Sequence, residues 1–441
     1  MLRADSLRPM SGLLSAGSAT IAVSAFSLSV FASVDIAAFF RTLTVIFAWL
    51  SVAIALTKLL AILLPRRRPA PDIGDDDLPT YTVIIPLFHE AHMVPGLIDA
   101  MSQFDYPNDK LDIIFACEAV DPVTVEAAQS LARPPFRVLV VPPVIQGGEP
   151  QTKPRALNYC LERSSGDLVT IYDAEDRPDP RQLRRAASAF MRHKSWTALQ
   201  APLDYFNASD SWLSAQFAIE YASLFHVLLP AFDRLGLPFP LGGTSNHIRR
   251  AHIEAAGGWD PFNVTEDADL AFRLTDRRTR IGWIDPPTAE EAVNRIKPWL
   301  RQRSRWLKGY IQTWRVHMRS PLQGGWRRAL MLQFTLGASL LAIFFYAPLV
   351  LILLLHSLTR MLGWHDLDLP YLYIGTLAFS CICGVILGAA GAIRAHKLRL
   401  LWHVPFMPVY WLLLFPPLIQ ALIELRTNPF YWHKTEHGVT G

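Results

Sequence analysis

A cluster of three carboxylates in four positions, Asp173-Ala174-Glu175-Asp176, is the first group of residues that could do chemistry. Carboxylates this close repel one another unless a cation or a proton lies between them. Their oxygen atoms suit Mg²⁺ or Mn²⁺, which would also bridge a diphosphate. The cluster therefore indicates a divalent metal site with Asp173, Glu175 and Asp176 as ligands. The alternative is a solvated turn ahead of the helix expected from Pro180.

A second acidic cluster, Thr265-Glu266-Asp267, precedes a helix-like run over 268–275. Taken alone, it is typical of a helix N-cap. Beside a metal-type cluster, Asp267 becomes a candidate general base that takes the proton of an attacking hydroxyl. Two separated carboxylate sites also occur in glycoside hydrolases. The triple acid cluster, together with Lys153 and Arg305 as phosphate ligands, favours a nucleotide donor instead.

The third cluster is Gln302-Arg303-Ser304-Arg305-Trp306, on a helix expected over 298–315. Helical spacing places Gln302, Arg305 and Trp306 on one side. Arg305 could meet a diphosphate through two hydrogen bonds and stabilise a leaving group, while Trp306 offers a flat face to a sugar ring. The alternative is an amphipathic helix whose Arg and Trp lie at the lipid headgroups.

Two weaker signals accompany these clusters. Lys153 and Pro154 open a helix-like segment whose N-terminus could contact phosphate, although Lys153 alone would read as surface charge. The small-residue segment 242–247 would allow a ligand to approach the backbone, and its His247 alone is more often structural.

These residues must be positioned by an alternation of short β-branched runs and helical segments that begins at Tyr81. We expect strands over 81–86, 111–117, 137–141, 168–172 and 198–201, and helices over 93–103, 154–163 and 180–192. This order predicts an α/β domain with a mostly parallel sheet. Ligands bind beyond the carboxyl ends of such strands, where the cluster at Asp173 falls.

Apolar runs flank this domain on both sides. The segments 13–34 and 42–64 are long enough to cross a bilayer, and the second ends in Pro65-Arg66-Arg67-Arg68, which predicts a cytoplasmic position for the polar half of the chain. Segments 329–355 and 371–393 are expected to span as well. The stretch 401–425 holds four prolines between basic flanks, which favours a broken, re-entrant or interface-lying element.

The resulting organisation has five parts: two membrane helices over 1–68, an exposed linker over 69–79, a cytosolic domain over 80–318, interface and membrane segments over 319–425, and a cytosolic tail over 426–441. Of the 441 residues, 51% are apolar and 18% charged, and the net charge of +4 is too small to argue for a nucleic-acid partner. The four cysteines form no disulfide framework.

From Tyr81 to about Trp314 the chain resembles glycosyltransferase family 2, in the membrane-embedded branch similar to bacterial cellulose synthase catalytic subunits. Val83-Ile84-Ile85-Pro86 to Glu90 resembles the first strand and its nucleotide-contacting acid, and Glu118 and Asp121 match the acids that hold the nucleoside. The remaining matches are Lys153 and Asn158 with the Lys…Ala-Leu-Asn element, Asp173-Ala174-Glu175 with the D-x-D metal motif, Gly243-Thr244-Ser245-Asn246 with the acceptor end, Thr265-Glu266-Asp267 with the T-E-D motif, and Gln302 to Trp306 with Q-x-x-R-W. Glu175 replaces the second Asp of D-x-D, which leaves open whether Glu175 or Asp176 meets the metal.

The resemblance implies a GT-A fold, a UDP-sugar donor, Mg²⁺ or Mn²⁺, and inversion at the anomeric carbon. It implies that Asp267 and Arg305 are catalytic, and that Glu90, Glu118, Asp121, Lys153, Asn158, Thr244, Ser245, Glu266, Gln302 and Trp306 bind substrates. We expect an enzyme of the bacterial inner membrane that extends and exports a polysaccharide, with a periplasmic or membrane partner subunit. A transferase that glycosylates a lipid and a non-catalytic receptor on the same fold are the alternatives. Residues 432–438 resemble a terminal element that could gate the donor site.

Overall fold

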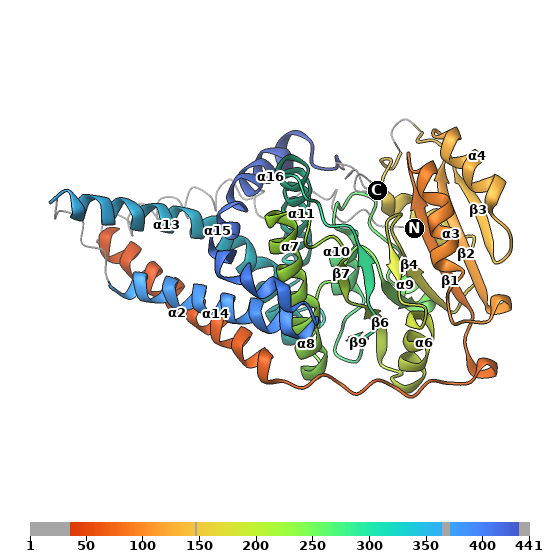
Figure 1. The fold of residues 1–441 in the computed structure, drawn as a ribbon, viewed down its shortest axis with the longest axis horizontal. Helices are drawn as coiled ribbons and strands as arrows, with labels where there is room; N and C mark the ends of the chain where they lie inside the picture. Colours follow the sequence, from red (N-terminus) through yellow and green to blue (C-terminus); the bar gives the residue numbers. More distant parts are fainter. Residues whose placement is uncertain (1–35, 146–147, 364–370, 432–441) are drawn as a thin grey trace, which may run out of the picture.

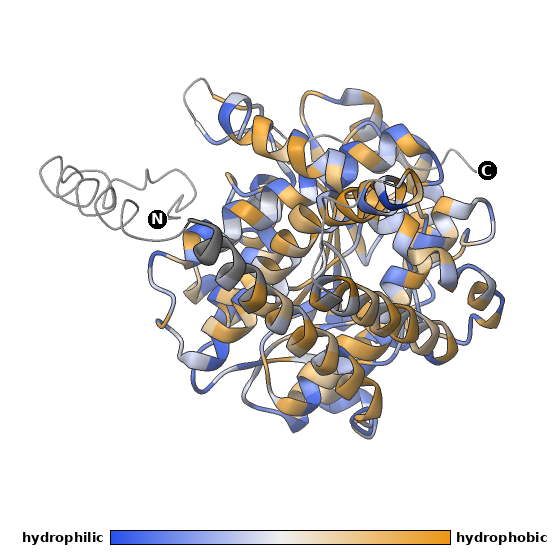
Figure 2. Ribbon diagram, turned by 90° about the vertical axis from the view of Figure 1, so that its left-hand side faces the viewer, coloured by the Kyte–Doolittle hydropathy of each residue, from blue (hydrophilic) through white to orange (hydrophobic). Residues whose placement is uncertain are grey.

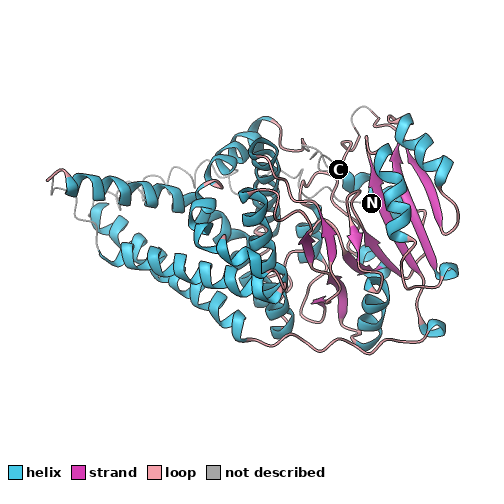
Figure 3. Cartoon of the chain, in the orientation of Figure 1, coloured by secondary structure: helices cyan, strands magenta, loops and turns pink. Residues whose placement is uncertain are grey.

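The computed structural model describes residues 36–145, 148–363 and 371–431. A mixed α/β body lies at one end of the molecule, and a group of long helices extends from the other end (Figures 1 and 3). The first predicted membrane segment, 13–34, and the gating element at 432–438 lie outside the described residues.

The α/β body is built on a seven-stranded sheet in the order β3-β2-β1-β4-β8-β6-β9. Its strands are β1 (Tyr81–Leu87), β2 (Leu111–Glu118), β3 (Phe136–Val141), β4 (Leu168–Ile171), β6 (Trp196–Gln200), β8 (Asn246–Arg249) and β9 (Arg280–Trp283). All neighbouring pairs are parallel except β8, which runs antiparallel to both β4 and β6. The prediction of a mostly parallel sheet is therefore confirmed.

A smaller sheet of β5 (Arg177–Pro178), β10 (Thr288–Glu290) and β7 (Leu203–Tyr205) lies beyond it in the chain. The sequence did not predict these short strands, nor β8 and β9. β8 has a consequence for the site. Its reversed direction brings the segment 242–245 to the carboxyl end of β4, where the backbone N–H of Ser245 donates to Ile171 O at 2.8 Å.

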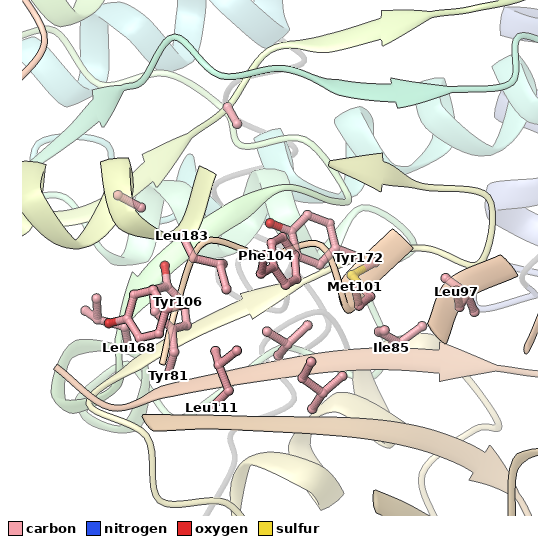
Figure 4. Close-up of a cluster of buried hydrophobic side chains, with 14 of the residues drawn as sticks. Tyr81, Ile85, Leu97, Met101, Phe104, Tyr106, Leu111, Leu168, Tyr172 and Leu183 are labelled. Atoms are coloured by element: carbon pink, nitrogen blue, oxygen red, sulfur yellow. The ribbon is translucent and has the colours of Figure 1, made fainter. Parts of the chain in front are cut away.

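Helices cover both faces of the large sheet, so its strands are apolar on both sides. On one face pack α3 (Val94–Met101), α4 (Pro122–Leu131) and α6 (Gln182–Arg192), and on the other α5 (Lys153–Leu161), α8 (Leu229–Leu235) and α10 (Glu266–Arg273). Figure 4 shows the first of these clusters, with Ile85 of β1 and Leu97 and Met101 of α3 among its members. The short helix α9 (Arg250–Ala255) buries Ile253 alone.

The helical end contains α2 (Ile36–Leu63), α13 (Ala338–Met361) and α14 (Tyr371–Arg394), and α2 packs along α14 (Figure 1). Viewed from this end, most of the exposed helices are hydrophobic (Figure 2). Three helical stretches, 326–361, 372–394 and 404–427, are long and apolar enough to cross a membrane. A fourth, 212–235, also qualifies by composition, but most of its side chains are buried within the protein.

That fourth stretch joins α7 (Trp212–Ser223), a π-helical turn (Leu224–Leu228) and α8, and the sequence did not predict it. A second π-helical turn (Gln333–Gly337) joins α12 (Trp326–Leu332) to α13. The proline-rich end is broken, as predicted, into 3-10 turns (Leu398–Trp402 and Val404–Phe406) and the helices α15 (Met407–Leu412) and α16 (Phe415–Thr427).

The segment predicted as an exposed linker is anchored to the α/β body. It forms a short 3-10 turn over Asp75–Asp77, and the Asp75 carboxylate accepts a hydrogen bond from Arg184 at 2.6 Å. Lys110 donates to the backbone carbonyls of Asp75, Asp76 and Leu78. These bonds fix the direction in which the chain leaves α2.

Candidate active site

One cavity of about 860 Å³ collects the three clusters that the sequence singled out. Asp173 and Glu175 reach it from the loop after β4, and Lys153 from the start of α5. Glu266 and Asp267 come from the first turn of α10, while α11 (Ile296–His317) supplies the box at its middle. The lining includes these predicted site residues: Glu90, Glu118, Lys153, Asp173, Glu175, Thr244, Glu266, Asp267, Gln302, Arg305 and Trp306.

The loop after β4 divides its carboxylates between two directions. Asp173 pairs with Lys153, whose ammonium also donates to Gly243 O at 2.8 Å, and Glu175 lines the cavity. Asp176 instead accepts hydrogen bonds from the Thr244 hydroxyl and from the backbone N–H of Asp173, the latter at 2.6 Å. Burial, with the charge of Asp173, raises the pKa of Asp176 to about 8. Asp176 therefore closes the loop, and Asp173 and Glu175 face the ligand space.

The two acids of α10 lie opposite this loop. Burial, together with the charge of Asp267, raises the pKa of Glu266 to about 7, and burial raises that of Asp267 to about 6. A carboxylate with a pKa just below neutral is ionised at pH 7 and still basic enough to accept a proton. Gly243 lies between the two sides, since a Cβ added there would stand 3.4 Å from Asp267 Oδ2 and 3.9 Å from Lys153 Nζ.

Lys153 is the cation at the centre of these acids. Burial alone would lower its pKa, but the carboxylates of Asp173, Glu266 and Asp267 raise it above its ordinary value. The ammonium therefore stays charged. It lies among these carboxylates and also lines the cavity, where it could pair with a further anion such as a diphosphate.

Helix α11 approaches α10 through a glycine. A Cβ at Gly309 would stand 2.4 Å from the side chain of Thr265, so any other residue there would push the two helices apart. Gly309 lies one turn after Arg305 on the same face of α11. The contact thus places Arg305 beside Glu266 and Asp267, whose charges partly offset the effect of burial, which lowers the pKa of Arg305.

A second arginine of the box, Arg303, fixes α11 to its other neighbours. Its guanidinium pairs with both carboxylate oxygens of Glu220 on α7 and donates to Tyr410 Oη on α15 at 2.7 Å. It also lies over the Trp306 ring, 4.8 Å from its centroid. The Trp306 ring in turn stacks on Tyr221 at 6.3 Å. Arg303, to which the sequence assigned no role, holds the box in place.

Three predicted substrate-binding residues do not line the cavity. Asp121 caps α4 by accepting from the backbone N–H of Thr124 and accepts from His89 N at 2.6 Å. Asn158 exchanges two hydrogen bonds with the backbone of Trp259, at 2.8 and 2.9 Å. The Ser245 hydroxyl donates to Thr288 Oγ1 at 2.6 Å. Each of these side chains is hydrogen-bonded within the protein, and a direct substrate contact for them stays a prediction.

Glu90 and Glu118 do reach the cavity, at the far end of the sheet from α11. Glu118 ends β2 and lies 3.5 Å from Arg155, and burial raises its pKa to about 7. The Glu90 carboxylate accepts from Phe88 N at 3.2 Å. Between them these acids could accept hydrogen bonds from the hydroxyls or the base of a nucleoside.

Several residues of the cavity were not predicted from the sequence. Glu290, at the end of β10, is buried, and burial together with the charges of Asp176 and Glu175 raises its pKa well above the ordinary value. Glu290 and Glu291 are two adjacent carboxylates at the end of a short strand, which is the same kind of pattern as the acidic cluster at Asp173. Tyr205 and Tyr221 also line the cavity, but no spacing pattern identified them.

The residues present fit a divalent metal only in part. Among the described residues, no group of three or more His, Cys, Asp or Glu side chains is arranged to hold a metal ion. Asp173 and Glu175 alone face the ligand space from one loop. Magnesium-type ions are commonly held by one or two carboxylates with the substrate's phosphates completing the shell, and this pair fits that arrangement.

The cavity continues from the acids into the helical end. Its further lining comes from α2, the α12–α13 junction, α13, α14, α15 and the residue before α16. Its apolar members are Ile54, Ala55, Phe334, Leu336, Ala338, Ala342, Ile343, Leu387, Met407, Trp411 and Leu414. The polar site and the apolar branch are therefore one continuous space.

The family model for glycosyl transferase family group 2 matches residues 168–423, more than half of the chain. The chain belongs to this family. The resemblance predicted from its motifs is thereby confirmed, and this glycosyltransferase is an enzyme that uses a nucleotide-sugar donor. The non-catalytic alternative is set aside.

Among its relatives, the β-monoglucosyldiacylglycerol synthase of Synechocystis is 25% identical over 379 residues, covering 82% of this chain and 75% of the relative. The UDP-forming cellulose synthase catalytic subunit of Komagataeibacter sucrofermentans is 27% identical over 265 residues, but these make up only 33% of that protein. A solved mannosyltransferase of Pyrobaculum calidifontis, in complex with GDP-Man and Mn²⁺, superposes with a TM-score of 0.52 at 18% identity, over 86% of this chain and 98% of its own. This likeness confirms the GT-A fold of the glycosyltransferase.

Proposed function

We propose that this glycosyltransferase moves one sugar, with inversion, from a nucleoside diphosphate to a hydroxyl group of a membrane lipid. The observation that supports this proposal above all others is the continuity of the cavity. A space lined by carboxylates and cations at one end opens, without interruption, into an apolar branch between helices long enough to span a membrane. A lipid has the same two ends, a polar headgroup and an apolar chain.

The donor would lie at the sheet end of the cavity. We propose that Glu118 and Glu90 meet the nucleoside and that Lys153 and Arg305 meet the diphosphate. Asp173 and Glu175 would hold Mg²⁺ or Mn²⁺ together with the phosphate oxygens. Such an ion, when bound, neutralises charge on the phosphates and favours departure of the leaving group. UDP is the expected nucleotide.

The reaction requires one base and one stabilised leaving group. The acceptor oxygen attacks the anomeric carbon as its proton passes to the Asp267 carboxylate. The bond from that carbon to the diphosphate oxygen breaks, and its electron pair leaves with the nucleoside diphosphate beside Lys153 and Arg305. A single displacement inverts the configuration of the anomeric carbon. Gln302, whose buried Oε1 has no partner among the described residues, could accept a hydrogen bond from a sugar hydroxyl.

The acceptor would approach from the apolar branch. Its lining of aliphatic side chains favours an acyl chain, because apolar contact there excludes water without leaving hydroxyls unpaired. The lipid-glycosylating relative supports this choice, since its match extends over three quarters of its length.

A polysaccharide acceptor, with processive extension and export, is the second candidate. The aromatic face of Trp306, stacked on Tyr221 at the edge of the cavity, favours it, because such faces bind pyranose rings. A dedicated path for a sugar chain would be lined mainly by aromatic and polar groups, whereas among the described residues of the apolar branch the aliphatic side chains outnumber them.

We further propose that the enzyme lies in the inner membrane of a bacterium with its active site on the cytoplasmic side. Four basic residues gather where the helices meet the α/β body: Arg66, Arg67, Arg394 and Lys397. The Arg66 guanidinium donates a hydrogen bond to the backbone carbonyl of Arg394 at 3.3 Å. Basic residues of this kind mark the cytoplasmic border of a membrane.

The proposal is tested with proteoliposomes that contain diacylglycerol and receive labelled UDP-glucose, UDP-N-acetylglucosamine or GDP-mannose with Mg²⁺ or Mn²⁺. We expect label from one donor to enter the organic phase as a monoglycosylated lipid, and the Asp267→Asn variant to lose this activity. Label in a long, water-soluble or insoluble chain would support the polysaccharide candidate instead. Transfer by Asp267→Asn at the wild-type rate would exclude Asp267 as the base.

A further inference from the structure

The apolar branch of the cavity contains a cation that the proposed transfer does not use. Lys58 lies on α2, half-buried, and lines the cavity together with Ile54 and Ala55. Within the described part of the chain it has no hydrogen-bond or ion-pair partner, and the titratable group that interacts with it is the neutral thiol of Cys383 on α14. An ammonium group in apolar surroundings is costly unless an anion accompanies it.

A second unsatisfied donor lies on the facing helix. The hydroxyl of Ser380, one turn before Gly384 and Cys383, is buried and has no hydrogen-bond partner among the described residues, although Ser380 also lines the cavity. Two other polar side chains of the cavity wall are already occupied: Ser51 donates to Ala48 O at 2.8 Å and Thr335 to Met331 O at 2.6 Å. Two helices thus each present one free donor to the same space.

The wall beside them is close-packed and apolar. A Cβ at Gly384 would stand 2.4 Å from the Trp411 ring, so the glycine allows this ring to lie directly against α14. Trp411 lines the cavity as well. A molecule that pairs with Lys58 and Ser380 and also fills the space against Trp411 combines an anionic group with an apolar part.

We propose that Lys58 and Ser380 form a binding site for the phosphate of an anionic membrane lipid, whose acyl chains occupy the apolar branch beside Trp411. An ammonium without a counter-ion favours an anion, and an ammonium and a hydroxyl can both donate to phosphate oxygens. The apolar lining favours a lipid over a free ion. The inference rests on the proposed function insofar as both place a lipid in this branch. It adds a headgroup charge that the transfer reaction does not require.

A simpler account is that Lys58 extends along α2 toward the membrane surface, as lysines near helix ends do. It begins eight positions before Arg66, which on a helix corresponds to about 12 Å. That account leaves the Ser380 hydroxyl unpaired and predicts no selectivity for anionic lipid inside the cavity. The two accounts can therefore be separated by binding alone.

The test uses the full-length protein in neutral detergent micelles and measures quenching of Trp411 by lipids with brominated acyl chains. The contribution of Trp411 is isolated as the difference between each protein and its Trp411→Phe counterpart. The probes are phosphatidylglycerol, which is anionic, and phosphatidylcholine, which is zwitterionic. We expect phosphatidylglycerol to quench at about tenfold lower concentration, the size expected of a charge-assisted hydrogen bond.

Three variants decide the result. Lys58→Gln should bind both lipids equally, whereas Lys58→Arg should keep the preference for phosphatidylglycerol. Arg399→Gln removes an exposed cation next to the membrane segments without touching the cavity, and it should keep the preference too. If Lys58→Gln retains the preference, or if wild type shows none, the site does not exist as proposed.

The last measurement is competition by inorganic phosphate. Displacement of phosphatidylglycerol by millimolar phosphate would show that the site takes a free ion, which would overturn the lipid assignment. Because none of these measurements involves sugar transfer, the proposed function could fail while this site stands, and the reverse holds as well.

Discussion

The raised pKa of Asp267 makes the pH dependence of the reaction a direct test of its role as base. An aspartate with its ordinary pKa of 3.8 would be ionised throughout the range from pH 5 to 8, and the rate would not depend on it there. Burial raises the pKa of Asp267 to about 6, so the carboxylate is about nine-tenths ionised at pH 7 and about one-tenth ionised at pH 5. A base must be ionised to accept a proton, so activity should fall as the pH falls.

The expected magnitude is about a tenfold loss of kcat/KM between pH 7 and pH 5, with the midpoint of the acid limb near pH 6. The assay is the initial rate of labelled sugar transfer in proteoliposomes at low donor concentration, with binding of UDP measured in parallel at each pH. Loss of UDP binding over the same range would assign the limb to the donor site instead.

Two variants assign the limb to a residue. The charge of Lys153 lowers the pKa of Asp267, so Lys153→Gln should move the midpoint to higher pH, whatever its effect on the rate itself. Glu266→Gln removes the neighbouring carboxyl, whose pKa is about 7, and should leave a limb near pH 6 in place. A rate that stays constant from pH 7 to pH 4.5, or a limb that vanishes in Glu266→Gln, would refute the assignment of Asp267.

Further predictions concern the neighbours of the site. Glu220→Gln leaves the buried Arg303 without its counter-ion and should lower the free energy of unfolding by about 2 kcal/mol, less than for a fully buried pair because Glu220 is 35% exposed. The melting temperature in detergent should fall, and an unchanged value would contradict the role of this pair. Gly243→Ala places a methyl group between Lys153 and the base Asp267, and should lower kcat/KM by about tenfold or more. Gly96→Ala, with nothing within 4 Å of its Cβ, should leave kcat/KM unchanged. Glu175→Gln should raise the Mn²⁺ concentration for half-maximal activity by about tenfold. Asp176→Asn replaces a carboxyl turned away from the cavity and should shift this concentration much less, whereas equal shifts would place both side chains on the metal.

Much of the site could be predicted because its chemistry depends on residue types at short spacing. Asp173, Asp267 and Arg305 belong to three clusters whose members are close in sequence, and the strand preceding Asp173 was plain from its β-branched residues. The family resemblance then supplied the order in which these clusters meet. The structure brings all three residues to one cavity.

The features that could not be predicted depend on contacts between distant segments. Asp176 turns from the cavity because Thr244, 68 positions later, lies next to it through the reversed strand β8. Gly309 is needed because the side chain of Thr265, from a distant segment, packs directly against it, and nothing in the sequence around Gly309 indicates this contact. The helix over 212–235 is apolar on nearly all sides because it is buried in the protein, so it shows none of the amphipathic spacing that identifies a surface helix.

In the proposed reaction, one sugar passes to a lipid hydroxyl with Asp267 as the base. Its most direct test is the fate of label from a nucleotide sugar in proteoliposomes that contain diacylglycerol, compared between wild type and Asp267→Asn. We expect a single labelled sugar on an extractable lipid, and a rate reduced by about 10² to 10⁴-fold in the variant. A labelled chain of many sugars would contradict the lipid acceptor, and equal rates in the two proteins would contradict the mechanism.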